Sequence, residues 1–159
     1  KDRKLLFFDI DGTLLSEKTH TVPQSAKEAL KKAKEKLEKI ESKGIVAKVI
    51  CNVTDIEQIN NFYQRAQELF SSVDIWINNA GVNQPDKAVY ELTKNKIDFL
   101  IDIDLKGTIY GSSIAFKNMK KLGFGQIYNI EGYGSNDAMM LGLSIYGTSK
   151  RAVIYFKKL

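Results

Sequence analysis

Two pairs of side chains in this 159-residue chain have a spacing that could support chemistry. Asp9 and Asp11 flank Ile10 at the end of an apolar run, where a buried parallel strand would place both carboxylates at the crevice beyond its carboxyl end. A carboxylate nucleophile with an acid two residues away and a cation beside it suits phosphoryl transfer. Tyr146 and Lys150 lie four positions apart in YGTSK, so a helix would carry both on one face.

The elements that must position these pairs alternate between strand and helix. Apolar runs predict four buried parallel strands, at residues 4–9, 45–51, 73–78 and 126–130. Periodic apolar positions and end signals predict helices over residues 23–44, 54–70, 94–122 and 144–159. Alternation of this kind predicts a single α/β domain over residues 1–159, a three-layer α/β/α sandwich whose four-stranded parallel sheet has the order 2-1-3-4.

Three local signals refine the predicted elements. Thr54 and Glu57 have the spacing of a capping box at the start of the second helix. Gly107 and Gly111 interrupt the third helical region and indicate close packing there. Trp76 lies in a predicted core strand, where we expect it to pack under a helix.

Composition narrows the class of protein. The chain is 43% hydrophobic and 27% charged, as in soluble globular proteins, and it has no apolar run of membrane-spanning length. Cys51 is the only cysteine, so no intrachain disulfide is possible, and we expect a reducing, cytoplasmic location without a secretory signal. The net charge of +5 comes mainly from lysines on helical faces, so neither nucleic-acid nor membrane binding is predicted.

The first aspartate pair lies within a recognisable motif. Residues 5–15, LLFFDIDGTLL, resemble the nucleophile motif of haloacid dehalogenase-like phosphatases, in their sugar-phosphatase branch. The resemblance implies that Asp9 attacks phosphorus, that Asp11 protonates the leaving group and that Mg²⁺ binds both carboxylates. It covers about the first 35 residues, and the other motifs of that family do not follow, so at most weak Mg²⁺ binding is expected.

Residues 38–159 resemble a different family, the short-chain dehydrogenases/reductases. The resemblance rests on CNVTD at 51–55, DIWINNAGVN at 74–83 and YGTSK at 146–150, and it is greatest to the chlorophyll b reductase-like branch. It implies that Tyr146 is the general acid/base, and that Lys150 lowers the tyrosine pKa and holds the nicotinamide ribose. The segment lining the adenosine side would be Asn78, Asn79, Ala80 and Gly81.

Two further positions depart from the dehydrogenase pattern. The usual place of the catalytic serine is held by Gly132 or Tyr133, and Ser135 is the candidate substitute. Asp104 falls where the family has a supporting asparagine.

The beginning of the chain also departs from that pattern. Asp9-Ile10-Asp11-Gly12 replaces the glycine-rich turn, and its carboxylates would repel a pyrophosphate. Both families have Rossmann-like folds, and the apolar stripe of the first helix continues through residues 33–42 without a change of phase. We therefore interpret the chain as an engineered chimera, phosphatase-derived over 1–36 and dehydrogenase-derived over 37–159, with no catalysis and no cofactor. The alternatives are a residual NAD(P)-binding dehydrogenase module and a weak Mg²⁺-dependent phosphatase using Asp9.

A homodimer is expected through the helices at 94–122 and 144–159. In the dehydrogenases that the chain resembles, the matching helices form a four-helix bundle between subunits. Those helices here carry more apolar residues than one sheet face can cover, and an exposed patch of this kind is commonly buried in a two-fold dimer. The alternative is that the residues belong to the monomer core. They are Ile109, Tyr110, Ile114, Phe116, Met119, Ile145, Val153, Ile154 and Phe156.

Overall fold

The computed structural model describes residue 47 and residues 49–157. The chain divides into two units, residues 1–50 and 51–159, and every helix and strand described below belongs to the second. The predicted strand at 4–9, the helix at 23–44, and Asp9 and Asp11 lie outside the described residues. The strand predicted at 45–51 is not formed by its described residues: they are irregular, and Ile50 is 90% exposed where a buried strand residue was expected.

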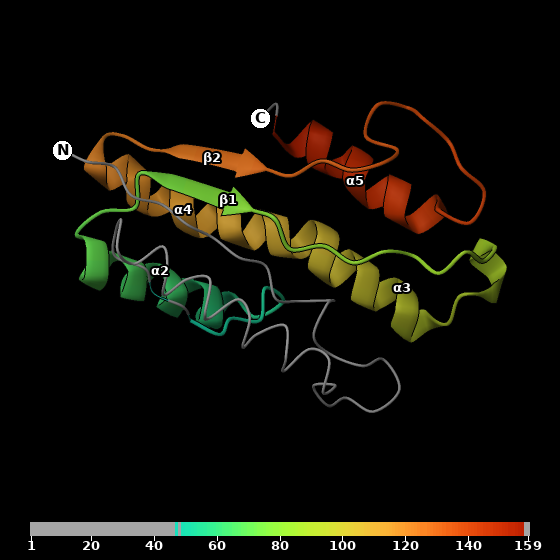
Figure 1. Cartoon of the computed structure of the whole chain (residues 1–159), viewed down its shortest axis with the longest axis horizontal. Helices are drawn as coiled ribbons and strands as arrows, with labels where there is room; N and C mark the ends of the chain where they lie inside the picture. The colour runs from blue at the N-terminus through green and yellow to red at the C-terminus, as the bar shows by residue number, and fades with distance from the viewer. Residues whose placement is uncertain (1–46, 48, 158–159) are drawn as a thin grey trace, which may run out of the picture. The chain divides into compact units, whose positions relative to one another are not determined.

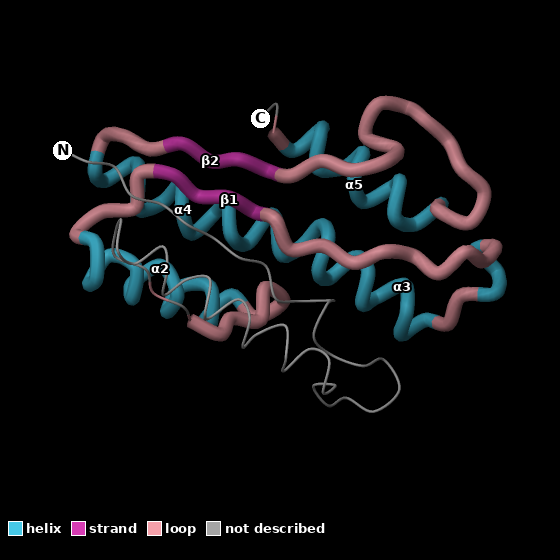
Figure 2. Tube along the Cα trace, in the orientation of Figure 1, coloured by secondary structure: helices cyan, strands magenta, loops and turns pink. Residues whose placement is uncertain are grey.

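Two short parallel strands lie side by side, β1 at Ile75–Asn78 and β2 at Gln126–Asn129 (Figures 1 and 2). Their register pairs Ile75 with Gln126 and Asn78 with Asn129. The third and fourth predicted strands are thus confirmed as parallel neighbours, although β1 begins two residues later than expected. The described residues contain only this pair of the four strands, so the three-layer arrangement and the order 2-1-3-4 remain predictions.

Helices connect and flank the strands. Their bounds are α2, Ile56–Phe70; the 3₁₀ turn η1, Val89–Glu91; α3, Lys94–Ile101; the π-helical segment η2, Asp102–Gly107; α4, Thr108–Leu122; and α5, Ser144–Phe156. Elements α3, η2 and α4 follow one another as a single long helical rod, as predicted for residues 94–122 (Figure 1). Helix α4 packs against both strands and α2, and α5 packs along α3 and η2. None of the described helices has the length and apolar character required to cross a membrane.

Close packing between α4 and β1 depends on a glycine. A Cβ on Gly111 would lie 2.1 Å from Asn78 Oδ1, and one on Gly107 would lie 2.9 Å from Val53 Cγ2. Both distances are shorter than van der Waals contact, so the prediction of close packing at these two glycines is confirmed. Trp76 is buried as predicted, with its ring centroid 5.6 Å from those of Phe62 and Tyr63 on α2.

The start of α2 corrects one local prediction. Asp55, not Thr54, is the N-cap: its Oδ1 accepts hydrogen bonds from the backbone N–H groups of Glu57 at 2.9 Å and Gln58 at 3.2 Å. The Thr54 hydroxyl instead donates to Asn52 Oδ1 at 2.9 Å. The capping-box prediction is therefore wrong, because a carboxylate one residue later satisfies the same helix N–H groups and also suits the positive end of the helix dipole.

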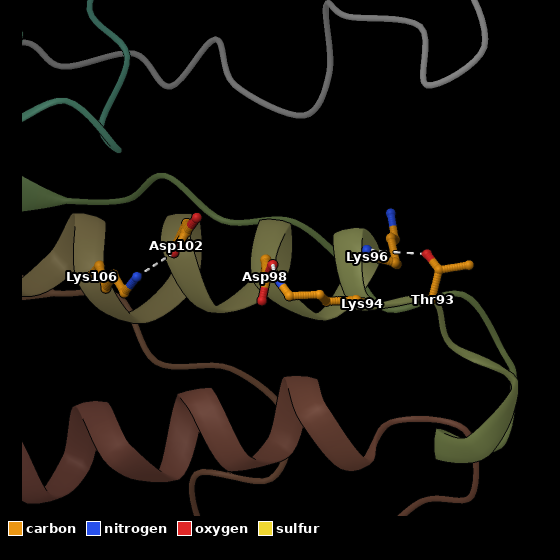
Figure 3. Close-up of polar contacts among 6 residues, drawn as sticks. All are labelled: Thr93, Lys94, Lys96, Asp98, Asp102 and Lys106. Carbon is orange, nitrogen blue, oxygen red and sulfur yellow. Dashed lines mark hydrogen bonds and ion pairs between the residues drawn. The ribbon is translucent and has the colours of Figure 1, made fainter.

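Charged pairs follow the exposed face of α3 and η2 (Figure 3). Lys94 pairs with Asp98, and Lys106 Nζ lies 2.7 Å from Asp102 Oδ1. Each pair has the i,i+4 spacing, and such exposed pairs contribute little to stability because water screens them. The Asp102–Lys106 pair spans η2, whose other face carries a buried carboxylate.

Candidate active site

Helix α5 brings Tyr146 and Lys150 together on one face. Lys150 is only 5% exposed, and its Nζ lies 5.6 Å from the centroid of the Tyr146 ring. The same ammonium makes one hydrogen bond within the described residues, a long one of 3.5 Å to the carbonyl of Ile130 at the end of β2. The four-residue spacing seen in the sequence thus places a buried cation beneath a phenol at the carboxyl end of the sheet.

The phenol of Tyr146 lies directly against the backbone after β2. A Cβ on Gly132 would be 2.3 Å from Tyr146 Oη, so the residue there has to be glycine while the phenol occupies this position. Tyr133, the other residue considered for the missing serine, is exposed and donates its hydroxyl to the carbonyl of Met139 at 3.3 Å. Gly132 is therefore the residue of this loop that contacts the phenol.

Asp104 is buried on the inner face of η2. It is 0% exposed, and its Oδ1 accepts from the backbone N–H of Val82 at 2.8 Å. Its Oδ2 lies 3.4 Å from the Ser149 hydroxyl, whose shorter hydrogen bond of 2.7 Å goes to the carbonyl of Tyr146. It thus connects the loop after β1 with α5. π-Helical segments are rare and frequently occur at functional sites. Asp104 is one of the buried residues of this segment.

The electrostatics of this group follow from burial. Burial raises the pKa of Asp104, an effect opposed by the Val82 hydrogen bond and the Lys150 charge. Burial also raises the pKa of Tyr146, and the Asp104 carboxylate adds to that increase. The pKa of Tyr146 is thus shifted upward, the opposite of the decrease that the resemblance to the dehydrogenases attributes to Lys150.

Gly81 lies where the carboxylate and the ammonium converge. A Cβ on Gly81 would be 3.4 Å from both Asp104 Oδ1 and Lys150 Nζ, whereas the glycine leaves that space open. The neighbouring Ala80 packs against the buried cluster Val82, Leu100 and Ile103. The loop after β1 therefore packs against the buried cluster at Ala80 and leaves space at Gly81.

The two asparagines before this loop differ in their environment. The Asn78 carboxamide is occupied by the scaffold: its Oδ1 accepts from Trp76 Nε1 at 2.8 Å, and its Nδ2 donates to Ser112 Oγ at 2.9 Å and Asn129 Oδ1 at 2.7 Å. It therefore ties β1 to β2 and α4. Asn79 is exposed at the strand end.

Ser135 is held near α5 through its backbone. Its N–H donates to the carbonyl of Gly132 at 3.1 Å, and its own carbonyl accepts from Arg151 Nη1 at 2.8 Å. Arg151 also pairs with Asp137, Nη2 to Oδ1, at 3.0 Å. In the described part of the chain, the Ser135 hydroxyl makes no hydrogen bond with Tyr146 or Lys150. The backbone of Ser135 therefore lies near α5, but its hydroxyl is not bonded to either member of the pair.

One buried polar residue near the site was not predicted. Gln84 is 3% exposed, and its side-chain oxygen accepts from backbone N–H groups of α5. Its partners are 61 and 62 residues away in the sequence, so no local pattern marks it.

Comparison with known proteins identifies the class. The short chain dehydrogenase family profile matches residues 12–159, and the chain belongs to this family. The probable chlorophyll(ide) b reductase NYC1 of Arabidopsis thaliana is 31% identical over 131 residues, covering 80% of this chain and 26% of that protein. An uncharacterised oxidoreductase of Staphylococcus aureus is 31% identical over 123 residues, covering 76% of this chain and 52% of that protein. The solved structure of ElxO with NADP bound is similar with a TM-score of 0.70 and 26% identity, covering 81% of this chain and 51% of that one.

These comparisons correct the main interpretation of the sequence. The family match begins at residue 12, within the segment assigned to a phosphatase, and continues through the supposed junction at 33–42. The apolar stripe in the sequence at 33–42 thus lies within one family match, and the interpretation as an engineered, non-catalytic chimera is wrong. The family is one of oxidoreductases with a Rossmann-like α/β fold, so the prediction that the chain is not an enzyme is also contradicted.

The prediction that no cofactor is involved is contradicted as well. Two similar solved structures of ElxO are described as holding NADP and NADPH, the second of them in a variant with a tyrosine replaced by phenylalanine. The phosphatase residues Asp9 and Asp11 lie outside both the matched range and the described residues. The chain spans about a quarter of the length of its plant relatives and about half of the length of ElxO.

Proposed function

We propose that this chain carries the catalytic pair of an NADP(H)-dependent reductase that interconverts a carbonyl compound and an alcohol. The observation that carries the proposal is the position of the Tyr146 phenol, against Gly132 and above the buried ammonium of Lys150. A phenol that can donate a proton, with a cation beside it, is the arrangement that protonation of a carbonyl oxygen requires.

The described residues fit the nicotinamide side of the cofactor. Lys150 is buried and makes a single long hydrogen bond within the described part of the chain, so its ammonium has donors left for ribose hydroxyl groups. Gly81 leaves space beside that ammonium. NADPH supplies the hydride when it is bound. The turn that would meet its pyrophosphate precedes the described residues.

Tyr146 acts in reduction as the acid. Its O–H bond breaks as the substrate oxygen gains a proton, and the phenolate that remains is stabilised by the Lys150 charge. Burial and Asp104 raise the pKa of Tyr146, so the phenol carries the proton that reduction requires. Asp104 acts at a distance by holding the Val82 backbone and Ser149, and Ser135 is the candidate for a hydrogen bond to the substrate.

The exposed apolar side chains of the loop between β2 and α5 favour an apolar carbonyl substrate. The loop between β2 and α5 exposes three consecutive apolar side chains, Met139, Met140 and Leu141. Flexible apolar side chains next to an active site provide adaptable contacts for a hydrophobic substrate. The name of the plant relatives, chlorophyll(ide) b reductase, agrees with a large substrate of this character.

NADPH fluorescence titration tests the proposal. We expect a saturable increase in fluorescence with the unmodified chain, its loss in Lys150→Met, and no change in Lys117→Met, which removes an exposed lysine from α4. With a panel of apolar aldehydes and ketones, Tyr146→Phe should reduce turnover by about 100-fold or more, the usual contribution of a general acid. The proposal fails if the unmodified chain gives no saturable response, or if Lys150→Met binds NADPH as well as the unmodified chain does.

A further inference from the structure

Helix α5, which carries Tyr146, lacks an N-terminal cap of its own. The residue at the N-cap position is Leu143, whose apolar side chain accepts no hydrogen bond. The first N–H groups of any helix have no partner within the helix and need an acceptor from elsewhere. In α5 the groups that an N-cap side chain normally satisfies are those of Ile145 and Tyr146.

Gln84 supplies the missing acceptor from the loop after β1. Its Oε1 accepts from the Ile145 N–H at 2.9 Å and from the Tyr146 N–H at 3.2 Å. Its Nε2 donates to the carbonyl of Lys87 at 3.2 Å. A backbone donor at one end of the carboxamide and a backbone acceptor at the other leave only one orientation that satisfies both.

We propose that Gln84 is the residue that positions α5, and with it Tyr146, against the loop after β1. The side chain is almost completely buried, so both of its hydrogen-bonding ends are used inside the protein. One of its bonds goes to the backbone of Tyr146 itself, the residue that has to be placed. The inference rests on the proposed function only in taking Tyr146 as the reacting group.

Little free space separates α5 from the loop after β2, so a shift of the helix would be transmitted to the phenol. A Cβ on Gly134 would lie 2.7 Å from Gly147 Cα, and one on Gly132 would lie 2.3 Å from Tyr146 Oη. The helix therefore touches the loop after β2 backbone against backbone. Gln84 holds α5 from the loop after β1, so the phenol is fixed between the loops that follow β1 and β2.

Substitutions separate positioning from simple capping. Gln84→Leu removes the carboxamide at similar size, and Gln84→Glu keeps an acceptor for both N–H groups. Adding Leu143→Asp to Gln84→Leu gives α5 an N-cap of its own without restoring the link to the loop. Asp55→Ala is the matched control, because Asp55 accepts from the same two positions at the start of α2.

The measurement follows Tyr146 in the full chain without cofactor. Tyrosines labelled with ¹³C at Cζ are titrated by NMR, with Tyr146 assigned from Tyr146→Phe, and amide exchange is followed at Ile145 and Tyr146. In Gln84→Leu we expect a displaced Tyr146 signal, loss of amide protection, and a titration midpoint that falls as the phenol gains water. Gln84→Glu should keep the protection, with no fall in the midpoint.

The double variant decides the outcome. If Gln84→Leu/Leu143→Asp regains amide protection while the Tyr146 signal stays displaced, the positioning role is supported. If the double variant restores the signal, or if Asp55→Ala displaces it equally, the proposal is overturned, because helix stability alone would then explain the effect. Should Gln84→Leu not fold, Gln84→Met in the Leu143→Asp background, compared with Leu143→Asp alone, provides the same comparison. NADPH is not needed, so failure of the chain to bind it would refute the proposed function and leave this test intact.

Discussion

A Cβ on Gly132 would lie 2.3 Å from the phenol oxygen of Tyr146, so this tyrosine and the loop after β2 are in contact at a position where no side chain fits. A residue with a side chain there must displace either the ring or the backbone. Gly132, one of the two residues at the place expected for a serine, therefore has no room for a serine side chain while the phenol occupies this position.

Gly132→Ala should therefore destabilise the chain and displace the phenol. Overpacking of this kind costs about 1–3 kcal/mol. The matched control is Gly147→Ala, whose Cβ would meet only Gly134 Cα at 3.9 Å and which should stabilise α5 by about 0.5–1 kcal/mol. Urea unfolding of both variants measures the two free energies, and equal effects of the same sign would contradict the contact.

Asp104→Asn should increase stability at neutral pH. Burial raises the pKa of Asp104 above its ordinary value of 3.8, so the folded state binds the proton more tightly than the unfolded state. This tighter proton binding adds to the free energy of unfolding. The contribution is fully present below the ordinary pKa of 3.8 and is lost as the pH rises through the folded pKa. Asparagine keeps the acceptor for the Val82 N–H and carries no charge at any pH.

The expected signature of Asp104→Asn is a change in pH dependence. Unfolding free energies of the unmodified chain should fall as the pH rises through the folded pKa of Asp104, and those of Asp104→Asn should not show this fall. The midpoint of the Tyr146 titration should decrease, because the Asp104 charge raises the pKa of that phenol. An unchanged pH profile would contradict a raised folded pKa, because the folded and unfolded states would then bind the Asp104 proton equally. An unchanged Tyr146 midpoint would contradict an effect of the Asp104 charge on that phenol.

Arg151→Ala should loosen the loop between β2 and α5. Arg151 donates to the carbonyl of Ser135 and pairs with Asp137, thereby tying the loop to the helix. Without it, limited proteolysis should cut faster around the exposed Met139 and Leu141. Arg65→Ala, which removes the exposed Arg65–Glu68 pair on α2, should leave that cleavage rate unchanged. Equal rates in all three proteins would exclude an anchoring role.

Association through the two long helical segments stays a prediction. Phe116 on α4 is 62% exposed and Tyr155 on α5 is also exposed, although Ala115, Met119 and Val153 on the same helices are buried. We expect light scattering at high micromolar concentration to give twice the chain mass of 18.0 kDa, and Phe116→Glu with Tyr155→Glu to reduce it to the mass of one chain. A single-chain mass for the unmodified protein would rule out the dimer, and Lys117→Glu, an exposed neighbour without apolar surface, controls for added negative charge.

Local sequence determined the elements and the spacing of Tyr146 and Lys150. Helices at 94–122 and 144–156, strands at 75–78 and 126–129, and the shared face of Tyr146 and Lys150 follow from periodicity, because neighbours along a helix or strand decide it. Gly107 and Gly111 were also recognisable, since glycine inside a helix is unfavourable unless packing requires it. The motif before residue 12 was misleading, because a short match says nothing about the domain to which it is attached.

Only the tertiary structure decided how these parts meet. The bonds from Ile145 and Tyr146 to Gln84, the burial of Asp104 in a π-helical segment, and the contact of Gly132 with the phenol join residues that are distant in sequence or on different elements. No periodic pattern marks such residues, because each lies in a loop or faces inward only through the packing of another element. Buried polar groups need hydrogen-bond partners, so the positions of Gln84 and Asp104 depend on which groups the folded chain places beside them.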